Sequence, residues 1–320
     1  MSVEEVAAGV YRLEEDDGGR VLCQYVVTGS KRALVVDTGL PESPAGGILP
    51  LLAEFEIDAD PVVLLTHPDA DHCGGTSSLV AARPASEVLA NAPDCRLLGD
   101  AERTIRERYL PYASSDGIVA SEVELDRMRA RLGDPYKVTR PLEREEFLDL
   151  GDRGCQILLV PGHSPGHAAA WLSETRVLVA GDAVMGQGIC NHDGSLRYAP
   201  QFYSPAAYRG TVERIRSLGV DLLLCAHEPP RSRRTAADFL TASLEAVDEL
   251  TRLVDDALGA GAVTLTAICA SVHQGYGDLP PGRAADLASS VAGILAERAH
   301  AGSVTVDDSI HPRQFRSERP

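Results

Sequence analysis

Four short apolar runs along the chain each lead into a histidine or an aspartate. Short apolar runs bounded by glycine, proline or polar residues predict buried β-strands. Open α/β sheets collect their functional side chains just past the carboxyl ends of such strands. We therefore expect four side chains to meet at one edge of the fold. The runs are 62–66 before His67, 155–160 before His163, 177–181 before Asp182, and 220–226 before His227.

The rest of the first 230 residues predicts further strands alternating with helices. β-rich stretches at 10–14 and 20–37, interrupted by glycine turns, predict hairpins of a first sheet. Apolar residues at helical spacing predict a helix over 45–55, and a second short helix is expected to begin near Thr76. This alternation predicts an α/β fold.

Two regions depart from this alternation. Residues 100–147 hold charged helices at 100–109 and 121–132 with no strand between them, and we predict a helical insertion. From residue 233 the strand pattern gives way to apolar residues at helical spacing. There we expect helices over 236–258, 263–272 and 284–300, a strand near 302–306, and a frayed polar tail from residue 311.

The segment from His67 to His72 is unusually rich in metal-binding side chains. It holds two imidazoles and the carboxylates of Asp69 and Asp71 within six residues. Imidazole and carboxylate groups are common ligands of Zn and of other divalent transition metals. Together with the later strand ends, this segment predicts a metal centre.

These motifs resemble those of the metallo-β-lactamase superfamily, whose pattern is T-H-x-H-x-D-H, then G-H-T-P-G-H, then G-D, then a late G-H. The matching residues occur in the same order. They are Thr66, His67, Asp71 and His72; Gly162, His163, Pro165, Gly166 and His167; Gly181 and Asp182; and His227, which follows Ala226 in place of glycine. The segment 33–39 also resembles the D-T-G segment of the family, with Asp37 at its aspartate.

The resemblance implies an αββα sandwich with a dinuclear metal site. One metal would bind His67, Asp69 and His163, the other Asp71, His72 and His227, and Asp182 would bridge them. Asp37 and His167 would support the ligands from behind. Asp71 would also orient or deprotonate the attacking water, so it is the expected catalytic residue.

Asp69 is the main departure from the family pattern, because it stands where the second motif histidine is usual. A carboxylate suits Mn or Fe better than an imidazole does, although Zn still accepts it. We expect two divalent metal ions, with Zn first and Fe or Mn as alternatives.

The resemblance implies a hydrolase in which a metal-bound hydroxide attacks an ester, thioester or lactone. Thioester or ester hydrolysis is preferred, because the insertion and the C-terminal region resemble those of the glyoxalase II-like and polyketide-thioesterase branches. Three alternatives stay open: a diiron redox enzyme acting on O₂ or NO, a metal-dependent ribonuclease or phosphodiesterase, and a binding protein that has lost catalysis.

Aromatic residues and a histidine in two segments are candidates for substrate contact. In the insertion they are Tyr109, Tyr112 and Tyr136, together with the basic residue Arg106. A long segment after Asp182 has the glycines and aromatics of an active-site loop. Its candidates are His192, Tyr198, Phe202 and Tyr203.

Composition bears on the expected substrate, on disulfide bonds and on the location of the protein. A net charge of −17 disfavours a long nucleic-acid footprint, so we expect a small-molecule substrate. The seven cysteines are scattered and predict no disulfide framework; Cys73, beside His72, is expected to pack rather than bind metal. No run approaches the roughly 20 apolar residues of a membrane span, and we expect a cytoplasmic protein.

Two domains are predicted. Residues 1–232 would form the metallo-β-lactamase-like catalytic domain, and 233–320 a helical, winged-helix-like subdomain. The helices of this subdomain carry few cations, so we expect it to pack against the catalytic domain or to form a homodimer rather than to bind DNA.

Overall fold

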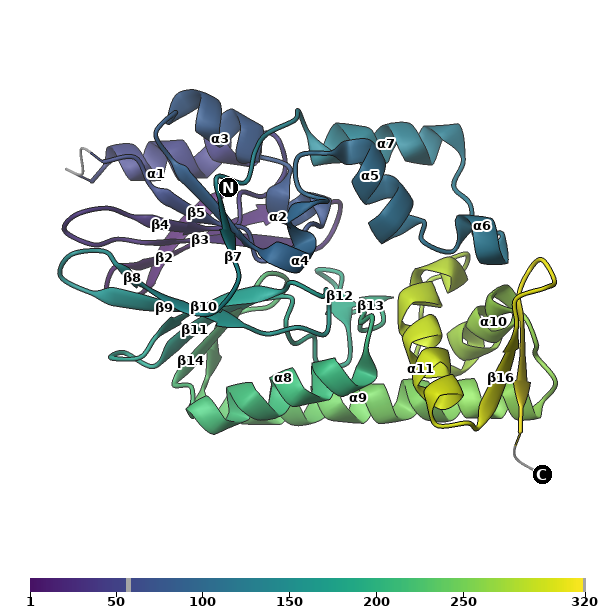
Figure 1. The fold of residues 1–320 in the computed structure, drawn as a ribbon. Coiled ribbons are helices and arrows are strands. Elements are labelled where there is room, and N and C mark those ends of the chain that lie inside the picture. Colours follow the sequence, from purple (N-terminus) through teal and green to yellow (C-terminus); the bar gives the residue numbers. More distant parts are fainter. Residues whose placement is uncertain (56–58, 319–320) are drawn as a thin grey trace.

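The computed structural model describes residues 1–55 and 59–318. Two sheets pack face to face, and helices cover the outer face of each sheet (Figure 1). This four-layer arrangement confirms the expected αββα sandwich. No helix in the described residues is long and apolar enough to cross a membrane.

The first sheet has seven strands in chain order, antiparallel from β1 to β4 and parallel from β4 to β7. The sequence predicted β2 to β5 but not β1, β6 or β7; the side chains of β1 are largely exposed at the edge of the sheet. The strands are β1 (Ser2–Ala7), β2 (Val10–Asp16), β3 (Val21–Val27), β4 (Leu34–Val36), β5 (Val62–Leu64), β6 (Glu87–Asn91) and β7 (Arg140–Leu142).

The second sheet has six strands in the order β15, β14, β11, β10, β9, β8. Only β11 and β14 run parallel to each other. The strands are β8 (Glu146–Asp149), β9 (Gly154–Leu159), β10 (Ala168–Leu172), β11 (Val177–Gly181), β14 (Leu222–Cys225) and β15 (Arg231–Ser232). The strands predicted at 155–160, 177–181 and 220–226 are thus confirmed as β9, β11 and β14.

An apolar core joins the two sheets. Leu64 of the first sheet and Val179 of the second belong to the same buried cluster. The hydroxyl of Tyr25, on β3, donates a 2.7 Å hydrogen bond to the carbonyl of Cys225, on β14. Burial of the apolar inner faces is the main stabilising term of such a sandwich, and it fixes the strand ends that carry the candidate site.

Helices pack on both outer faces. The first sheet is covered by α1 and α3, and the second by α8 and α9. The helices are η1 (Pro44–Ile48), α1 (Leu49–Ala53), α2 (Ala70–Cys73), α3 (Thr76–Ala82), α4 (Ala92–Cys95), α5 (Ala101–Thr104), η2 (Ile105–Tyr109), α6 (Ala113–Asp116), α7 (Glu122–Leu132), α8 (Pro205–Leu218), α9 (Arg233–Gly259), α10 (Leu265–Gly275), η3 (Ala284–Leu287) and α11 (Ala288–His300).

The helical insertion contains α5, η2, α6 and α7. Its longest helix, α7, starts with a capping box in which Ser121 and Glu124 satisfy each other's backbone amides. The last part of the predicted insertion is not helical, because 100–147 also includes β7 and the first two residues of β8, which belong to the two sheets. Their short length hid them among charged residues.

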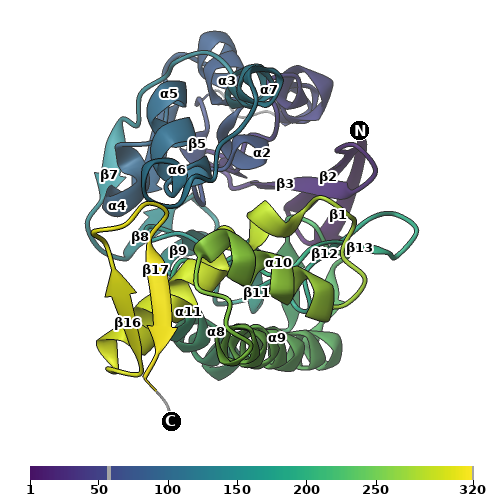
Figure 2. The ribbon, with the colours of Figure 1, turned by 90° about the vertical axis from the view of Figure 1, so that its right-hand side faces the viewer.

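The C-terminal region consists of the far part of α9, then α10, α11 and the hairpin β16 (Val304–Asp307) and β17 (Gln314–Ser317). The expectation of a frayed tail was wrong, because β17 pairs with β16 and Phe315 is buried in the core; residues 319–320 lie outside the described part. Arg313 pairs with buried Asp116 at 2.6 Å, so the hairpin meets the helical insertion (Figure 2).

Candidate metal centre

The four predicted strand ends converge at one edge of the sandwich. His67 lies just past β5, His163 past β9, Asp182 past β11 and His227 past β14. Asp71 and His72 sit on α2, immediately after the loop that carries His67. All six side chains are buried, so the structure brings together residues that are up to 160 positions apart in the sequence.

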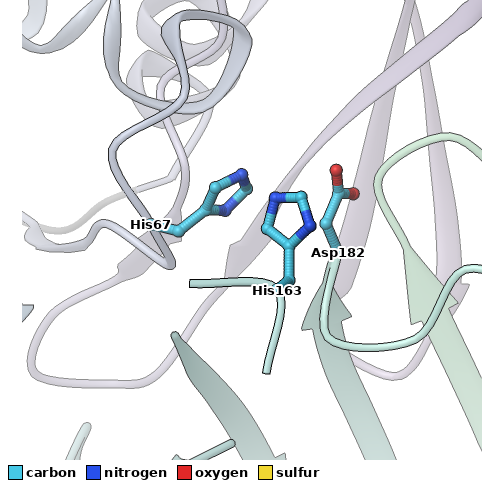
Figure 3. A group of neighbouring side chains, drawn as sticks. All are labelled: His67, His163 and Asp182. Carbon is cyan, nitrogen blue, oxygen red and sulfur yellow. The ribbon is translucent and has the colours of Figure 1, made fainter. Parts of the chain in front are cut away.

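Their potential ligand atoms form two groups of three. We call these two groups the first and the second metal position. The first consists of His67, His163 and Asp182, and the second of Asp71, His72 and His227. Within each group the atoms lie within 4.8 Å of one another. Figure 3 shows the first position, where the two imidazoles and the carboxylate lie close together.

The four imidazoles are held in a single orientation by their Nδ1 atoms. Nδ1 of His72 donates to Oδ2 of Asp37 at 2.7 Å, and Nδ1 of His163 to the carbonyl of Gln201 at 2.9 Å. The remaining two donate to Thr66 Oγ1 (His67, 3.0 Å) and to the carbonyl of Val21 (His227, 2.8 Å). In the neutral form of each ring, a donating Nδ1 leaves the lone pair of Nε2 directed toward the centre, as a metal ligand requires.

The donor atoms fit a divalent metal. In the described part of the chain, Nε2 of His67, His72 and His227 is buried and has no hydrogen-bond partner. Buried polar atoms without a partner are costly, and a bound metal is one of the few ways to satisfy several at once. Burial and the neighbouring His72 lower the pKa of His67 to about 4, which keeps this ring neutral and able to bind metal.

Asp182 lies between the two positions. Its Oδ2 is 3.4 Å from Nε2 of His227 and 3.6 Å from Nε2 of His72, although its carboxylate also belongs to the first position. Burial would raise the pKa of Asp182, but these two imidazoles lower it well below its usual value. An ionised carboxylate in this place suits the predicted bridge.

Asp69 belongs to neither of the two groups of potential ligands. Its carboxylate receives two 2.7 Å hydrogen bonds from Arg108, on η2, and its Oδ2 lies 3.1 Å from Nε2 of His163 and 3.3 Å from Nε2 of His67. Burial would raise the pKa of Asp69, but Arg108 lowers it well below its usual value. The carboxylate thus faces the first position but is already paired with a cation.

A second arginine reaches the second position. Nη2 of Arg20 lies 2.5 Å from Oδ2 of Asp71, and its guanidinium is also held by Asp17 at 2.7 Å. Burial would raise the pKa of Asp71, but Arg20 and the neighbouring imidazoles lower it. Asp71 is therefore ionised.

Sequence reasoning missed both arginines at the centre and favoured Arg106 in the insertion. Arg106 is exposed and pairs with Glu107. The five-residue π turn of η2 turns Arg108 toward the centre instead. A cation near Asp69 could have been expected, because a buried carboxylate needs a partner.

Asp37 and His167 both contact residues that we expect to bind metal. Asp37 accepts hydrogen bonds from the amide and hydroxyl of Thr66 as well as from His72. Nε2 of His167 accepts a 3.2 Å hydrogen bond from the amide of Asp182, so this nitrogen is not free to bind metal. The His167 ring stacks on His67 with centroids 4.9 Å apart.

A cavity of about 640 Å³ opens beside the second position, and His227 and His192 are among its lining residues. His192 is exposed and its Nε2 lies 2.6 Å from Oδ1 of Asp16. Tyr198, on the short hairpin β12 (Ile189–Cys190) and β13 (Leu196–Tyr198), has Arg20 over its ring at 5.5 Å. Both residues lie near the centre and stay candidates for substrate contact.

The other aromatic candidates have different surroundings. Phe202 is fully buried and packs against Tyr208, which corrects its assignment, since a core ring has no surface for a substrate. Tyr203 is 38% exposed and lines a smaller cavity of about 150 Å³ together with Arg108. The hydroxyl of Tyr109 accepts a 2.7 Å hydrogen bond from the amide of Ala70 and so fixes the start of α2.

Comparison with known proteins agrees with this geometry. The model of the metallo-β-lactamase superfamily matches residues 19–227. The acyl-coenzyme A thioesterase MBLAC2 of Homo sapiens is 29% identical over 66% of this chain and 73% of the relative. The hydroxyacylglutathione hydrolase of Methylococcus capsulatus is 27% identical over 64% of this chain and 63% of the relative.

Two solved structures share the whole fold. The metallo-β-lactamase family protein TTHA1429 of Thermus thermophilus superposes with a TM-score of 0.73 at 19% identity, covering 98% of this chain and 100% of that one. A β-lactamase domain protein from Burkholderia ambifaria gives 0.69 at 16% identity, covering 98% and 93%. Both matches extend through the C-terminal region.

Proposed function

This chain belongs to the metallo-β-lactamase superfamily, and we propose that it is a metal-dependent hydrolase of a small-molecule thioester or ester. The observation that carries the proposal is the set of buried Nε2 atoms of His67, His72 and His227, which face two carboxylates and have no partner among the described residues. We propose two metal ions, with Zn as the first candidate and Fe or Mn as alternatives.

A divalent metal bound at these residues would lower the pKa of a water molecule and polarise the substrate carbonyl. The ionised Asp71, held by Arg20, is placed to accept a hydrogen bond from the attacking water and orient it. No side-chain nucleophile is needed. Cys73 is unsuited to that role, because burial raises the pKa of its thiol.

The choice of a thioester rests on the relatives and on the cavity. One relative is an acyl-coenzyme A thioesterase and another a hydroxyacylglutathione hydrolase, both of which act on acylated thiols by name. The cavity beside His227 offers space for an acyl or leaving group, and its lining includes apolar Val21 and Phe239 as well as the cation Arg12. Lactones stay a second substrate class to be tested.

The experiment is a substrate panel on the protein purified without chelators, with its metal content measured by mass spectrometry. Acyl-coenzyme A and S-acylglutathione should be hydrolysed faster than a lactone or a phosphodiester. Chelation should abolish turnover and added Zn²⁺ should restore it. His72→Ala should lose activity, whereas the distant surface change Arg129→Gln should retain it. Turnover that persists after complete metal removal would refute the proposal, as would bound iron with no hydrolysis of any substrate.

A further inference from the structure

Arg108 makes an unusual set of contacts at the first position. Its Nε and Nη2 atoms each lie 2.7 Å from one oxygen of Asp69, and its Nη1 donates to the carbonyl of His163 at 3.1 Å. The Nη2 atom also lies 2.9 Å from Nε2 of His163. The arginine side chain is only 11% exposed, so these contacts are formed away from solvent.

The contact with His163 uses the atom that a metal would need. Nδ1 of His163 donates to the carbonyl of Gln201, so its Nε2 carries the only lone pair of the ring. A metal ion must approach that lone pair to about 2.1 Å. With Nδ1 donating to Gln201, Nη2 of Arg108 donates a hydrogen bond to this lone pair, and Oδ2 of Asp69 lies 3.1 Å from the same nitrogen. One lone pair cannot serve both Arg108 and a metal ion.

The other three imidazoles differ in this respect. Nε2 of His67, His72 and His227 has no hydrogen-bond partner in the residues that the structure describes. The second position also has a neighbouring arginine, but the hydrogen bonds of Arg20 there go to the carboxylates of Asp17 and Asp71. Both histidines of the second position are therefore ready to bind, whereas the first position has one of its two histidines blocked.

Asp69 is a second residue at the first position that Arg108 occupies. The family resemblance would make this residue a ligand of the first metal, but both of its oxygens are engaged by the guanidinium. A metal at the first position would have to separate a bidentate ion pair that is shielded from water. The cavity of about 150 Å³ that Arg108 lines gives the side chain space into which to turn.

We infer that Arg108 is a built-in cation that competes with metal for His163 and Asp69, so that the two positions fill unequally. The second position, with Asp71, His72 and His227, fills first. The first position fills only when Arg108 turns away. The inference rests on the metal centre of the proposed function but is tested by metal binding alone.

The experiment is a calorimetric titration of the metal-free full chain with Zn²⁺ alone. The wild type should bind one equivalent tightly and a second about tenfold or more weaker. Arg108→Gln should tighten the weak event by about tenfold or more, because His163 and Asp69 are released. Arg106→Gln is the matched control, since Arg106 lies on the same turn but pairs with Glu107 at the surface, and it should behave as the wild type.

Two further variants assign the binding events. His163→Ala should remove the weak event and keep the tight one, and His72→Ala should do the reverse. If Arg108→Gln does not fold, Arg108→Lys replaces it, because lysine keeps the charge but cannot span both oxygens and the imidazole, and it should tighten the weak event to a smaller degree.

The inference is overturned if the wild type binds two Zn²⁺ ions with equal affinity, or if a folded Arg108 variant leaves the weak event unchanged. Either result leaves the proposed hydrolase intact. Absence of Zn²⁺ binding in wild type and variants alike would overturn the proposed function together with the inference.

Discussion

Asp37 holds His72 in place through a 2.7 Å hydrogen bond from Nδ1 of the imidazole to Oδ2 of the carboxylate. Asp37 adopts a left-handed backbone conformation, with φ of 62°, just past β4. The same carboxylate accepts two hydrogen bonds from Thr66, next to His67. One buried aspartate therefore orients His72, a proposed ligand at the second position. It also orients Thr66, which in turn orients His67, a proposed ligand at the first position.

Asp37→Asn should weaken metal binding by about 10- to 100-fold, because partners of metal ligands fix the orientation and basicity of the imidazole. Asparagine tolerates the left-handed conformation, so the substitution tests the charge and not the backbone. The measurement is competition for Zn²⁺ with a chromophoric chelator. Unchanged affinity in a protein of unchanged thermal stability would contradict this role.

Tyr109→Phe should destabilise the fold by about 1–3 kcal/mol, because the amide of Ala70 loses the hydroxyl that accepts its hydrogen bond. If Tyr109 acts only on α2, the loss of stability should come with weaker metal binding at Asp71 and His72. Denaturant unfolding and Zn²⁺ titration measure the two effects. A variant with normal stability and metal binding but a raised KM would instead assign Tyr109 to substrate contact.

Much of the fold and most of the candidate site could be predicted from the sequence, because these signals are local. A buried strand that leads into a candidate ligand can be recognised within about eight residues, as at 62–67. Four such strand ends meet at one edge of the sandwich. The positions of Arg20 and Arg108 depend on distant contacts with Asp71 and Asp69, so no local pattern marks them. Phe202 was misassigned because an aromatic residue in a loop has the same sequence pattern whether it packs inward or outward.

The reactivity of the cysteine thiols tests which cysteines are buried and whether Cys190 lines the cavity. Cys190 is exposed and lines the cavity beside His227, whereas burial raises the pKa of Cys23, Cys155 and Cys269 to about 12. An aromatic disulfide reagent should therefore modify Cys190 first in the native protein, and the buried thiols only after unfolding. Cys190→Ser should remove this first phase.

A bulky maleimide on Cys190 should also slow hydrolysis, since it would fill part of the cavity that we propose for the substrate. The Cys190→Ser protein treated with the same reagent is the control and should keep its activity. Full activity after complete modification of Cys190 would place the substrate elsewhere.

Asp94 is a buried carboxylate whose ionisation should make the stability of the fold depend on pH. This carboxylate is 1% exposed. Its Oδ2 accepts a 2.5 Å hydrogen bond from the hydroxyl of Ser164, and its Oδ1 has no hydrogen-bond partner in the described residues. Burial raises the pKa of Asp94 above its ordinary value of 3.8. The folded protein therefore binds this proton more tightly than the unfolded chain does.

It follows that the contribution of Asp94 to stability is most favourable below pH 3.8 and declines as the pH rises through the raised pKa. Asp94→Asn keeps an oxygen that accepts from Ser164 and removes the buried charge. Each unit by which the pKa is raised corresponds to about 1.4 kcal/mol that the variant regains at neutral pH, less whatever attraction to Arg108 is lost. Unfolding free energies of the two proteins should diverge as the pH rises from 4 to 7, with the variant more stable, whereas the exposed Asp16→Asn should show no such gain. Curves for Asp94→Asn and wild type that stay parallel over this range would show that burial does not raise the pKa of Asp94.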